Sequence, residues 1–328
     1  MKLALSAPSR ADLAGGTLDI WPLPHLFPGS RTLNVALDAR VVLEMEDGQP
    51  AFRFSGPEGV RDFADIGEIC SSPFALYGEL YKAVPPPSPV HVNILGLPPP
   101  QSGLGGSSAL ALSVARGLVC LRGENPDPDF LIALCRDGEA AVMGYPTGIQ
   151  DYYPALFGGI CVIEYLKGKT DWRPLPFPPA LADGLILYHT GAAHHSGANN
   201  WEVVRNAITD KKGPAFACLR AIAGVALRME EALLKEDIGA VGRLMGEEWE
   251  YRRQLHPAFS HPRIDEALDA ALRAGALGGK ACGAAGGGTV AVLAPPEKRG
   301  AVAEALGRLQ GKVLDIHPTQ SGLEVSEC

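Results

Sequence analysis

Hydrophobic and polar residues alternate over much of the first hundred positions of the chain, and this pattern predicts β-strands. The strand-like segments are Lys2–Ala7, Arg31–Glu46, Ala51–Ser55 and Val90–Leu95. Between Trp201 and Ala274 the apolar residues instead recur every three to four positions, which predicts helices. A strand, a helix and a strand are predicted in the remaining tail. Strands that lead, helices that follow and a mixed tail favour the α+β class.

Two helices are expected between these regions. The run "GSSALALSVARGLVCLRG" is apolar on nearly every side, which is typical of a buried helix starting near Ser107. Asp127 followed by Pro128 has the pattern of an N-cap with proline at the first helical position, so a second helix should run to about Met143. The segments "GGICVIEYL" and "DGLILYHT" are predicted to be short buried strands.

Composition and charge narrow the classes of function. At 328 residues the chain can form one large domain divided into two lobes, and a net charge of −8 argues against a nucleic-acid partner. No apolar run approaches the ~18 residues of a membrane span, and the N-terminal residues resemble a strand rather than a signal peptide. Seven scattered cysteines without a C-x-x-C pair indicate reduced thiols and a cytoplasmic protein.

The stretch "PPPQSGLGGSSA", which begins at Pro98, places glycines at the predicted start of a helix. Glycine lets backbone N–H groups face a ligand without an intervening Cβ, and a helix start adds unpaired N–H donors and a positive dipole end. This combination is typical of a phosphate-binding site.

Four interpretations of this loop compete. A Walker A loop needs a lysine and a hydroxyl that "GGKA" at residues 278–281 does not supply in the required spacing. A dinucleotide fingerprint fails because Ser108 stands where its third glycine belongs. The loop is then either a plain helix start or a nucleotide-phosphate loop in which a serine hydroxyl meets magnesium.

Three further segments decide between these. "APSRADLAGGTLD" (residues 7–19), "GIQDYYPALFGG" (148–159) and "GGKACGAAGGGTVAVL" (278–293) accompany the loop in order. Together they resemble the GHMP kinases, the family of galactokinase, homoserine kinase and mevalonate kinase, and in particular its branch of heptose 7-phosphate kinases and related sugar kinases. The resemblance implies a two-lobed α+β fold, with an N-terminal ATP-binding lobe over residues 1–170 and a C-terminal lobe over residues 171–328.

The resemblance also implies roles for individual residues. Asp151 would orient or deprotonate the acceptor hydroxyl, and Arg10 would stabilise the transferring phosphoryl group. Ser107 and Glu139 would hold Mg²⁺, which prefers such oxygen ligands. The ATP phosphates would contact Gly103, Leu104, Gly105, Gly106, Ser107 and Ser108.

On the acceptor side the resemblance implies contacts from Gly16, Thr17, Asp19, Lys280, Gly286 and Gly287. Many family members read G-G-G-T-D where this chain reads G-G-T-L-D before and at Asp19, which leaves the sugar open. Lys280 is expected to bind a phosphate already present on the acceptor, in preference to Arg252 or Arg253.

The resulting prediction is an ATP- and Mg²⁺-dependent kinase that phosphorylates a hydroxyl of a sugar or sugar phosphate. A mevalonate- or homoserine-type kinase remains an alternative, as does a non-catalytic sugar-binding regulator of the same family. A small-molecule substrate is the expected partner, with neither nucleic acid nor membrane, and a homodimer is left open.

Overall fold

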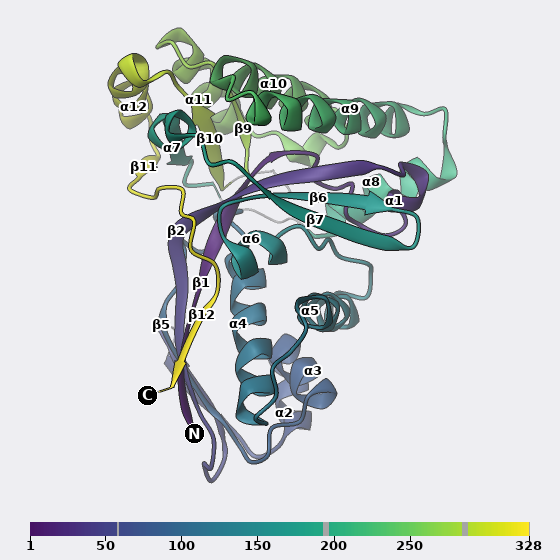
Figure 1. Ribbon diagram of the computed structural model, residues 1–328, viewed down its shortest axis with the longest axis vertical. Coiled ribbons are helices and arrows are strands. Elements are labelled where there is room, and N and C mark those ends of the chain that lie inside the picture. The colour runs from purple at the N-terminus through teal and green to yellow at the C-terminus, as the bar shows by residue number, and fades with distance from the viewer. Residues whose placement is uncertain (58, 193–196, 284–287, 328) are drawn as a thin grey trace.

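The computed structural model of the protein describes all residues except 58, 193–196, 284–287 and 328. A mixed eight-stranded sheet is the larger of its two sheets. Its strands run in the order β12-β1-β2-β5-β3-β4, while β6 pairs with β2 and β7 with β6 (Figure 1). The strands are β1 (Lys2–Ala14), β2 (Ser30–Glu46), β3 (Phe52–Gly56), β4 (Gly59–Phe63), β5 (His91–Gly96), β6 (Ile160–Leu166), β7 (Lys169–Leu175) and β12 (Glu324–Glu327).

The long strand β1 changes character along its length. Its first residues alternate between buried and half-buried positions, whereas every residue from Ala7 to Ala14 is buried. Its pairing with β2 shifts register between Pro8 and Ser9 and again between Asp12 and Ala14. Such irregularities bend a strand and often occur next to active sites. The regular segment between them carries Arg10.

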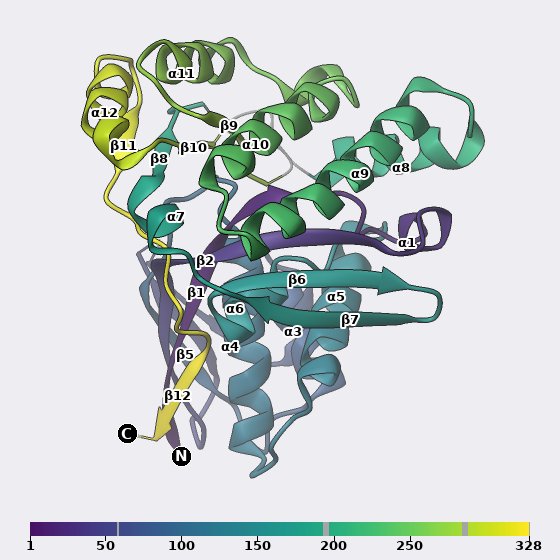
Figure 2. The same ribbon diagram turned by 45° about the horizontal axis from the view of Figure 1, so that its top comes forward.

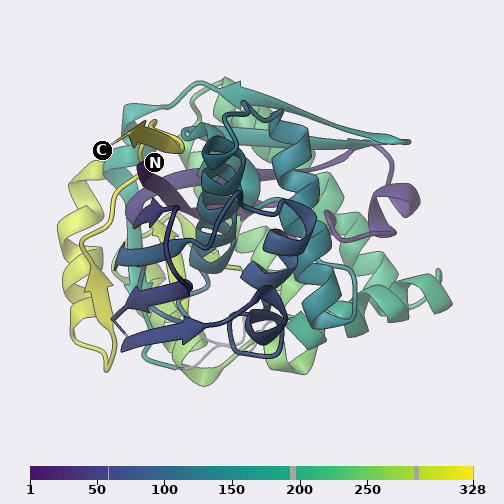
Figure 3. The ribbon, with the colours of Figure 1, turned by 90° about the horizontal axis from the view of Figure 1, so that it is seen from below.

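Helices α2 to α6 cover one face of this sheet (Figures 1 and 3). The central helix, α4, is buried along most of its length, as its uniformly apolar sequence predicts. It packs against β1 and β2 and shares a hydrophobic core with Leu5, Leu43 and Leu80. The helices are α2 (Ile66–Cys70), α3 (Ala75–Ala83), α4 (Gly106–Leu121), α5 (Pro128–Met143) and α6 (Tyr152–Phe157).

A second, four-stranded antiparallel sheet in the order β11-β8-β10-β9 carries the remaining helices and a core of its own (Figure 2). Its elements are β8 (Leu185–His189), β9 (Gly278–Ala281), β10 (Thr289–Leu293), β11 (Lys312–Leu314), α9 (Pro214–Leu234), α10 (Ile238–Arg252), α11 (Pro262–Arg273) and α12 (Arg299–Gly307). The short helices α1 (Leu23–Leu26) and α7 (Pro179–Gly184), with α8 (Gly197–Thr209), complete the set. The predicted α+β class is confirmed.

The two lobes are joined by a common hydrophobic cluster and by strand pairing. A third hydrophobic cluster joins Leu33 and Val35 of β2 to Met229 of α9 and Met245 of α10. The predicted boundary near residue 170 falls inside the β6–β7 hairpin, and β12 at the chain's end pairs with β1. The lobes are therefore continuous through both their strands and their core.

The cysteines and the helices can also be described individually. The six cysteines among the described residues are free, and Cys135, Cys161, Cys218 and Cys282 are buried. In the part of the chain that the structure describes, none of the helices combines the length and apolar character needed to cross a membrane.

Candidate active site

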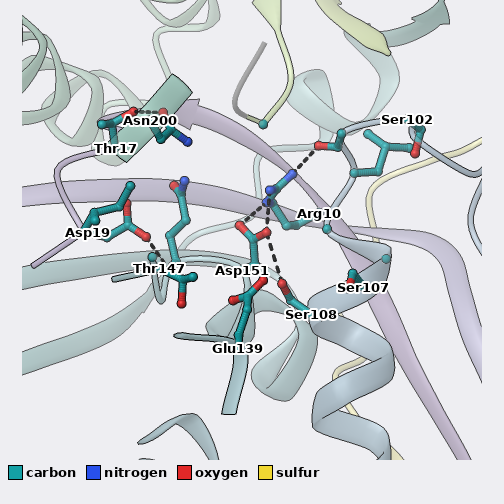
Figure 4. A pocket seen from close by; sticks show the side chains of 18 of the residues that line it. Arg10, Thr17, Asp19, Ser102, Ser107, Ser108, Glu139, Thr147, Asp151 and Asn200 are labelled. Carbon is teal, nitrogen blue, oxygen red and sulfur yellow. Dashed lines mark hydrogen bonds and ion pairs between the residues drawn. The ribbon is translucent and has the colours of Figure 1, made fainter. Parts of the chain in front are cut away.

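A cavity of about 400 Å³ opens where the two lobes meet (Figure 4). Its walls are the glycine loop before α4, the end of α5, the segment from Tyr145 to Asp151, and the loop after β1. Arg252 of α10 and Asn200 of α8 close it from the second lobe. Every residue expected to contact ATP phosphates, from Gly103 to Ser108, lines this cavity.

The glycine loop ends at Gly105, the N-cap residue of α4. Gly105 has φ +75°, and a Cβ built on it would lie 3.3 Å from Oδ2 of Asp151. Only glycine combines this left-handed backbone with so close an approach at little cost. The first N–H groups of α4 have no partner within the helix, so this end of α4 offers donors and a positive dipole end to an anion.

The C-terminal glycine motif packs directly on this loop. The backbone N–H of Thr289 donates to the carbonyl oxygen of Ser102 at 2.8 Å. Gly103 and Gly283 face each other so closely that a Cβ on either would lie 2.8 Å from a backbone oxygen of the other segment. Gly286 and Gly287, which were expected to contact the acceptor, lie outside the described residues.

Arg10 and Asp151 form a two-pronged ion pair in the cavity. Nε of Arg10 donates to Oδ1 of Asp151 at 2.7 Å, and Nη2 donates to Oδ2 at 2.7 Å. Nη1 donates to the carbonyl oxygen of Gly103 at 2.6 Å. The guanidinium therefore ties β1, the glycine loop and the start of α6 together (Figure 4). Such paired charge-assisted hydrogen bonds fix direction as well as distance.

Arg10 stays charged in this setting. Burial acts against its charged form, but the neighbouring carboxylates of Asp151 and Asp12 raise the pKa of Arg10 above its ordinary value. Its positive charge therefore lies beside the glycine loop at every pH at which the protein folds. That is the position in which a cation can stabilise negative charge on a transferring phosphoryl group.

Glu139, Ser107 and Ser108 lie around the N-terminus of α4. Glu139 accepts a hydrogen bond from the Tyr152 hydroxyl at 3.0 Å, and burial raises the pKa of its carboxyl group. Ser108 is buried and its hydroxyl donates to Asp151 at 3.4 Å, whereas Ser107 is exposed to the cavity. The two serines therefore face different partners, and Ser107 is the one open to a ligand.

Asp19 lies across the cavity from Arg10. Its Oδ2 accepts hydrogen bonds from the backbone N–H groups of Ile149 at 2.7 Å and Gln150 at 3.0 Å. Burial raises the pKa of Asp19 to about 6, against the opposing effect of these hydrogen bonds. Among the described residues, Oδ1 of Asp19 and Oε1 of Gln150 are buried without a hydrogen-bond partner. Both oxygens belong to residues that line the cavity, where a ligand's hydroxyl groups could satisfy them.

Thr17 has an unusual backbone for a β-branched residue, with φ +76°. Its hydroxyl donates to Oδ1 of Asn200 at 3.3 Å and accepts from Nη1 of Arg252 at 3.2 Å. A Cβ on Gly16 would lie 2.6 Å from Nη2 of Arg252, so the missing side chain makes room for this guanidinium. The loop after β1 is thereby held against the second lobe in a strained conformation, as is common at ligand sites.

The expectation for Lys280 requires correction. Lys280 is 0 % exposed, and its ammonium group contacts Oδ2 of Asp12 at 2.5 Å and Oε2 of Glu248 at 3.1 Å. Glu248 also holds Arg252, the cation that does line the cavity. Asp12, Glu248, Arg252 and Lys280 thus form a buried quartet with two charges of each sign. Lys280 is therefore neutralised inside the protein and does not line the cavity.

Some residues of this site escape sequence reasoning. Gln150 and Asn200 carry no motif of their own, and only proximity to Asp151 in "GIQD" could have drawn attention to Gln150. The Glu248–Arg252 pair has the four-residue spacing of an ordinary exposed salt bridge on a helix, so the sequence gives no sign that this pair is buried. These contacts depend on segments that only the folded chain brings together.

Comparisons with known proteins agree with this arrangement. Residues 74–159 match the GHMP kinases N terminal domain, and residues 229–312 match the GHMP kinases C terminal family. The two matches together span more than half of the chain.

Similar sequences are themselves kinases. The D-glycero-alpha-D-manno-heptose 7-phosphate kinase of Campylobacter jejuni is 26% identical, over 97% of this chain and 96% of its own length. A galactokinase of Mycobacterium tuberculosis is 28% identical over 63% of this chain and 65% of its own. A mevalonate kinase of Thermococcus gammatolerans is 29% identical over 73% and 69%.

Solved structures show the same fold. A D-glycero-D-manno-heptose 1-phosphate kinase from Bacteroides thetaiotaomicron superposes with a TM-score of 0.79 at 23% identity, covering 99% of both chains. The galactokinase of Lactococcus lactis, solved with galactose, gives a TM-score of 0.78 at 18% identity over 98% of this chain and 95% of its own.

Fold and site together define a phosphotransferase that acts on an alcohol group. The chain belongs to the GHMP kinase family. The predicted resemblance is confirmed, and with it the prediction that the protein is a kinase.

Proposed function

We propose that this protein transfers the γ-phosphoryl group of ATP to a hydroxyl of a sugar phosphate, with a heptose phosphate as the preferred acceptor. The observation that carries the proposal is the two-pronged Arg10–Asp151 pair set at the open N-terminus of α4. A cation, a carboxylate and a phosphate-binding helix start within one cavity are the elements that phosphoryl transfer requires.

The reaction then follows from the positions of these groups. The acceptor hydroxyl oxygen forms a bond to the γ-phosphorus, the bond from that phosphorus to the bridging oxygen breaks, and ADP leaves. Asp151 takes the proton of the hydroxyl, a role that needs its carboxylate form. Arg10 keeps a positive charge beside Asp151 and the glycine loop, and this charge stabilises the negative charge on the transferring group.

Ser107 and Glu139 would hold the Mg²⁺ that accompanies ATP. The donors fit, because both residues line the cavity and supply the hard oxygen atoms that this ion prefers. Among the described residues no cluster of three or more metal-ligating side chains exists, but Mg²⁺ bound to nucleotide phosphates needs only one or two protein carboxylates. When bound, the ion would neutralise phosphate charge.

The acceptor side favours a polyhydroxylated substrate. Asp19 and Gln150 present unpaired oxygens that accept hydrogen bonds, and Arg252 presents a fixed donor from the other lobe. A sugar ring supplies several hydroxyl donors and acceptors at once. The named relatives that act on heptose phosphates and galactose support this choice.

Two alternatives are tested together with the proposal. A mevalonate-type kinase is suggested by the Thermococcus relative, although mevalonate offers fewer hydroxyls to the acceptors at Asp19 and Gln150. A non-catalytic sugar binder would have no use for the Arg10–Asp151 pair. We place the enzyme in the cytoplasm, where its free buried thiols would remain reduced.

The deciding measurement is ADP release with heptose 7-phosphate, heptose, galactose, mevalonate and homoserine, each with a no-acceptor control and with and without Mg²⁺. The highest kcat/KM is expected for the heptose phosphate, and turnover is expected to require Mg²⁺. Preference for mevalonate or homoserine would reassign the enzyme within the family. Binding of a sugar, together with no ADP release in the presence of any of these acceptors, would establish the non-catalytic alternative.

A further inference from the structure

A second cavity, of about 950 Å³, adjoins the catalytic cavity. Asp19 and the segment Tyr145–Thr147 line both cavities and form their common boundary. The other walls are helix α1, the last two turns of α5, and the turn of the β6–β7 hairpin (Figures 1 and 2). These walls come from three separate parts of the chain, and α1 contacts β6 directly.

Three basic side chains line this second cavity, one from each wall. They are His25 of α1, Arg136 of α5 and Lys169 at the start of β7. Their convergence is not produced by a local motif, because no two of them are close in sequence.

Lys169 and Arg136 form only weak, exposed ion pairs with carboxylates. Lys169 is 65% exposed and lies 3.5 Å from Asp171, a residue outside the cavity wall. Arg136 is 44% exposed and pairs with the adjacent Asp137 through Nε alone. Exposed pairs of this kind contribute little and exchange readily for a stronger partner.

The acidic groups on the same walls are Asp19 and Asp137. Asp19 turns Oδ2 toward two backbone N–H groups at the boundary, and burial favours its protonated form. Asp137 is the partner of Arg136. Lys169 and the terminal nitrogens of Arg136 are therefore the groups best placed to meet an additional anion.

The catalytic cavity offers no comparable cation among the described residues. Arg10 is paired with Asp151, and Arg252 donates hydrogen bonds to Glu248 at 3.0 Å and 2.6 Å. Lys280, the cation expected to meet an acceptor phosphate, is fully buried. A second phosphate on the acceptor would have to be neutralised elsewhere.

We propose that the second cavity binds the phosphate that the acceptor sugar already carries, through Lys169, Arg136 and His25. This inference rests on the proposed function and adds the location and direction of the substrate. The reacting hydroxyl lies at Asp151, the ring passes Asp19, and the phosphate extends past Tyr145 into the second cavity. The phosphate and the reacting hydroxyl are thus at opposite ends of the acceptor.

This arrangement predicts selectivity for a phosphorylated acceptor. A phosphate dianion gains charge-assisted hydrogen bonds from lysine and arginine, whereas the free sugar leaves these side chains to water. A sugar phosphorylated next to the reacting hydroxyl would hold its phosphate away from Lys169 and Arg136 and would not gain these contacts. The site therefore favours acceptors that carry a phosphate, and among these it favours acceptors whose phosphate is far from the reacting hydroxyl.

The test compares Lys169→Met and Arg136→Met with Lys167→Met, an exposed lysine of the same hairpin turn that does not line the cavity. KM is measured for heptose 7-phosphate, free heptose and ATP. Each cavity variant should raise KM for the phosphosugar on the order of tenfold, the loss of one charge-assisted hydrogen bond. KM for free heptose and for ATP should not change, and Lys167→Met should match the wild type.

Two results would overturn the inference: an unchanged phosphosugar KM in both cavity variants, or a raised KM for ATP, which would assign the cavity to the nucleotide. Calorimetric titration of the phosphosugar onto the protein with a non-hydrolysable ATP analogue separates this inference from the proposed function. Weaker binding to Lys169→Met supports the phosphate site even if the wild type releases no ADP. Equal binding to wild type and variant rejects the phosphate site while leaving kinase activity intact.

Discussion

At the scale of single residues, the proposed chemistry depends on the carboxylate of Asp151. Asp151→Asn keeps the size of the side chain and removes the base, so kcat should fall by at least ~10²-fold while the Kd of ATP changes little. Steady-state kinetics and nucleotide titration measure both quantities. Asp62→Asn, which breaks an exposed pair with Arg53, serves as the matched control. Wild-type turnover in Asp151→Asn would remove Asp151 from the mechanism.

The raised pKa of Asp19 predicts an acid limb in the pH profile. In the proposed acceptor site Asp19 would accept hydrogen bonds from hydroxyls best as a carboxylate, and its pKa of about 6 means that it becomes protonated as the pH falls below 6. The value of kcat/KM for the acceptor should therefore decline below pH 6, and Asp19→Asn should lack this limb. A limb that persists unchanged in Asp19→Asn would assign it to another group.

The same shift has a defined sign for stability. The folded protein holds the Asp19 proton up to about pH 6, whereas an unfolded chain releases it near 3.8. The contribution of this group to stability is therefore full below pH 3.8 and is lost as the pH rises through 6. Urea unfolding at pH 8 should find Asp19→Asn at least as stable as the wild type.

The placement of a residue in the cavity was predictable where the residue belongs to a motif, and unpredictable where its contacts arise only on folding. Arg10, Glu139 and Asp151 line one cavity, as their motifs imply, and their catalytic and metal-binding roles stay predictions. Lys280 lies in a glycine motif as well, yet its partner Asp12 is 268 residues away in the sequence. No local pattern could show that this lysine would be neutralised internally.

At the scale of elements, the junction between the glycine loop and α4 is the most sensitive. Gly105→Ala would add a Cβ to a left-handed residue, a strain of about 1–2 kcal/mol, and would place it 3.3 Å from Asp151 and Arg10. The variant should lose that much stability and also raise the KM for ATP.

Gly123, at the other end of the same helix, provides the control. It has φ +73°, and a Cβ there would meet nothing within 4 Å. Gly123→Ala should show a similar loss of stability in urea unfolding without any effect on ATP. Equal ATP kinetics for the two variants would mean that the loop does not approach the nucleotide.

Elements were predictable where their periodicity was strong. Helix α5 begins at Pro128 and ends at Met143, as its N-cap and spacing predict, and the strand over Arg31–Glu46 is found as β2. Strand β7 was missed because Pro174 and charged residues mask its pattern. A proline is tolerated there because β7, within the described part of the chain, pairs with β6 alone and forms an edge of the sheet. Strand β12 is defined by its pairing with β1 rather than by its own sequence.

At the scale of the whole molecule, the buried quartet fastens the second lobe to β1. Burial alone would raise the pKa of Asp12, but Lys280, Arg252 and Arg10 hold it well below its ordinary value. Asp12 therefore contributes stability at neutral pH that is lost only at strongly acidic pH.

Replacing Lys280 should consequently lower the free energy of unfolding without changing the preference between the phosphosugar and the free sugar. Lys280→Met leaves Asp12 and Glu248 with too little positive charge in a buried site, which costs about 3–5 kcal/mol in the free energy of unfolding. Urea unfolding measures the loss, with the exposed Lys298→Met as the control. Where the variant is still folded, kcat/KM should change by the same factor for the phosphosugar and the free sugar. A selective loss for the phosphosugar would restore Lys280 to the acceptor site.

Strand β1 also fixes the spacing between two functional contacts. Arg10 and Asp12 are two residues apart on an extended strand, so they share one face about 6.6 Å apart. The first is joined to Asp151 of one lobe and the second to Lys280 and Gly283 of the other. One inserted residue between them would turn one of the two to the opposite face. In the proposed reaction, the alignment of phosphate donor and acceptor thus depends on the number of residues between Arg10 and Asp12.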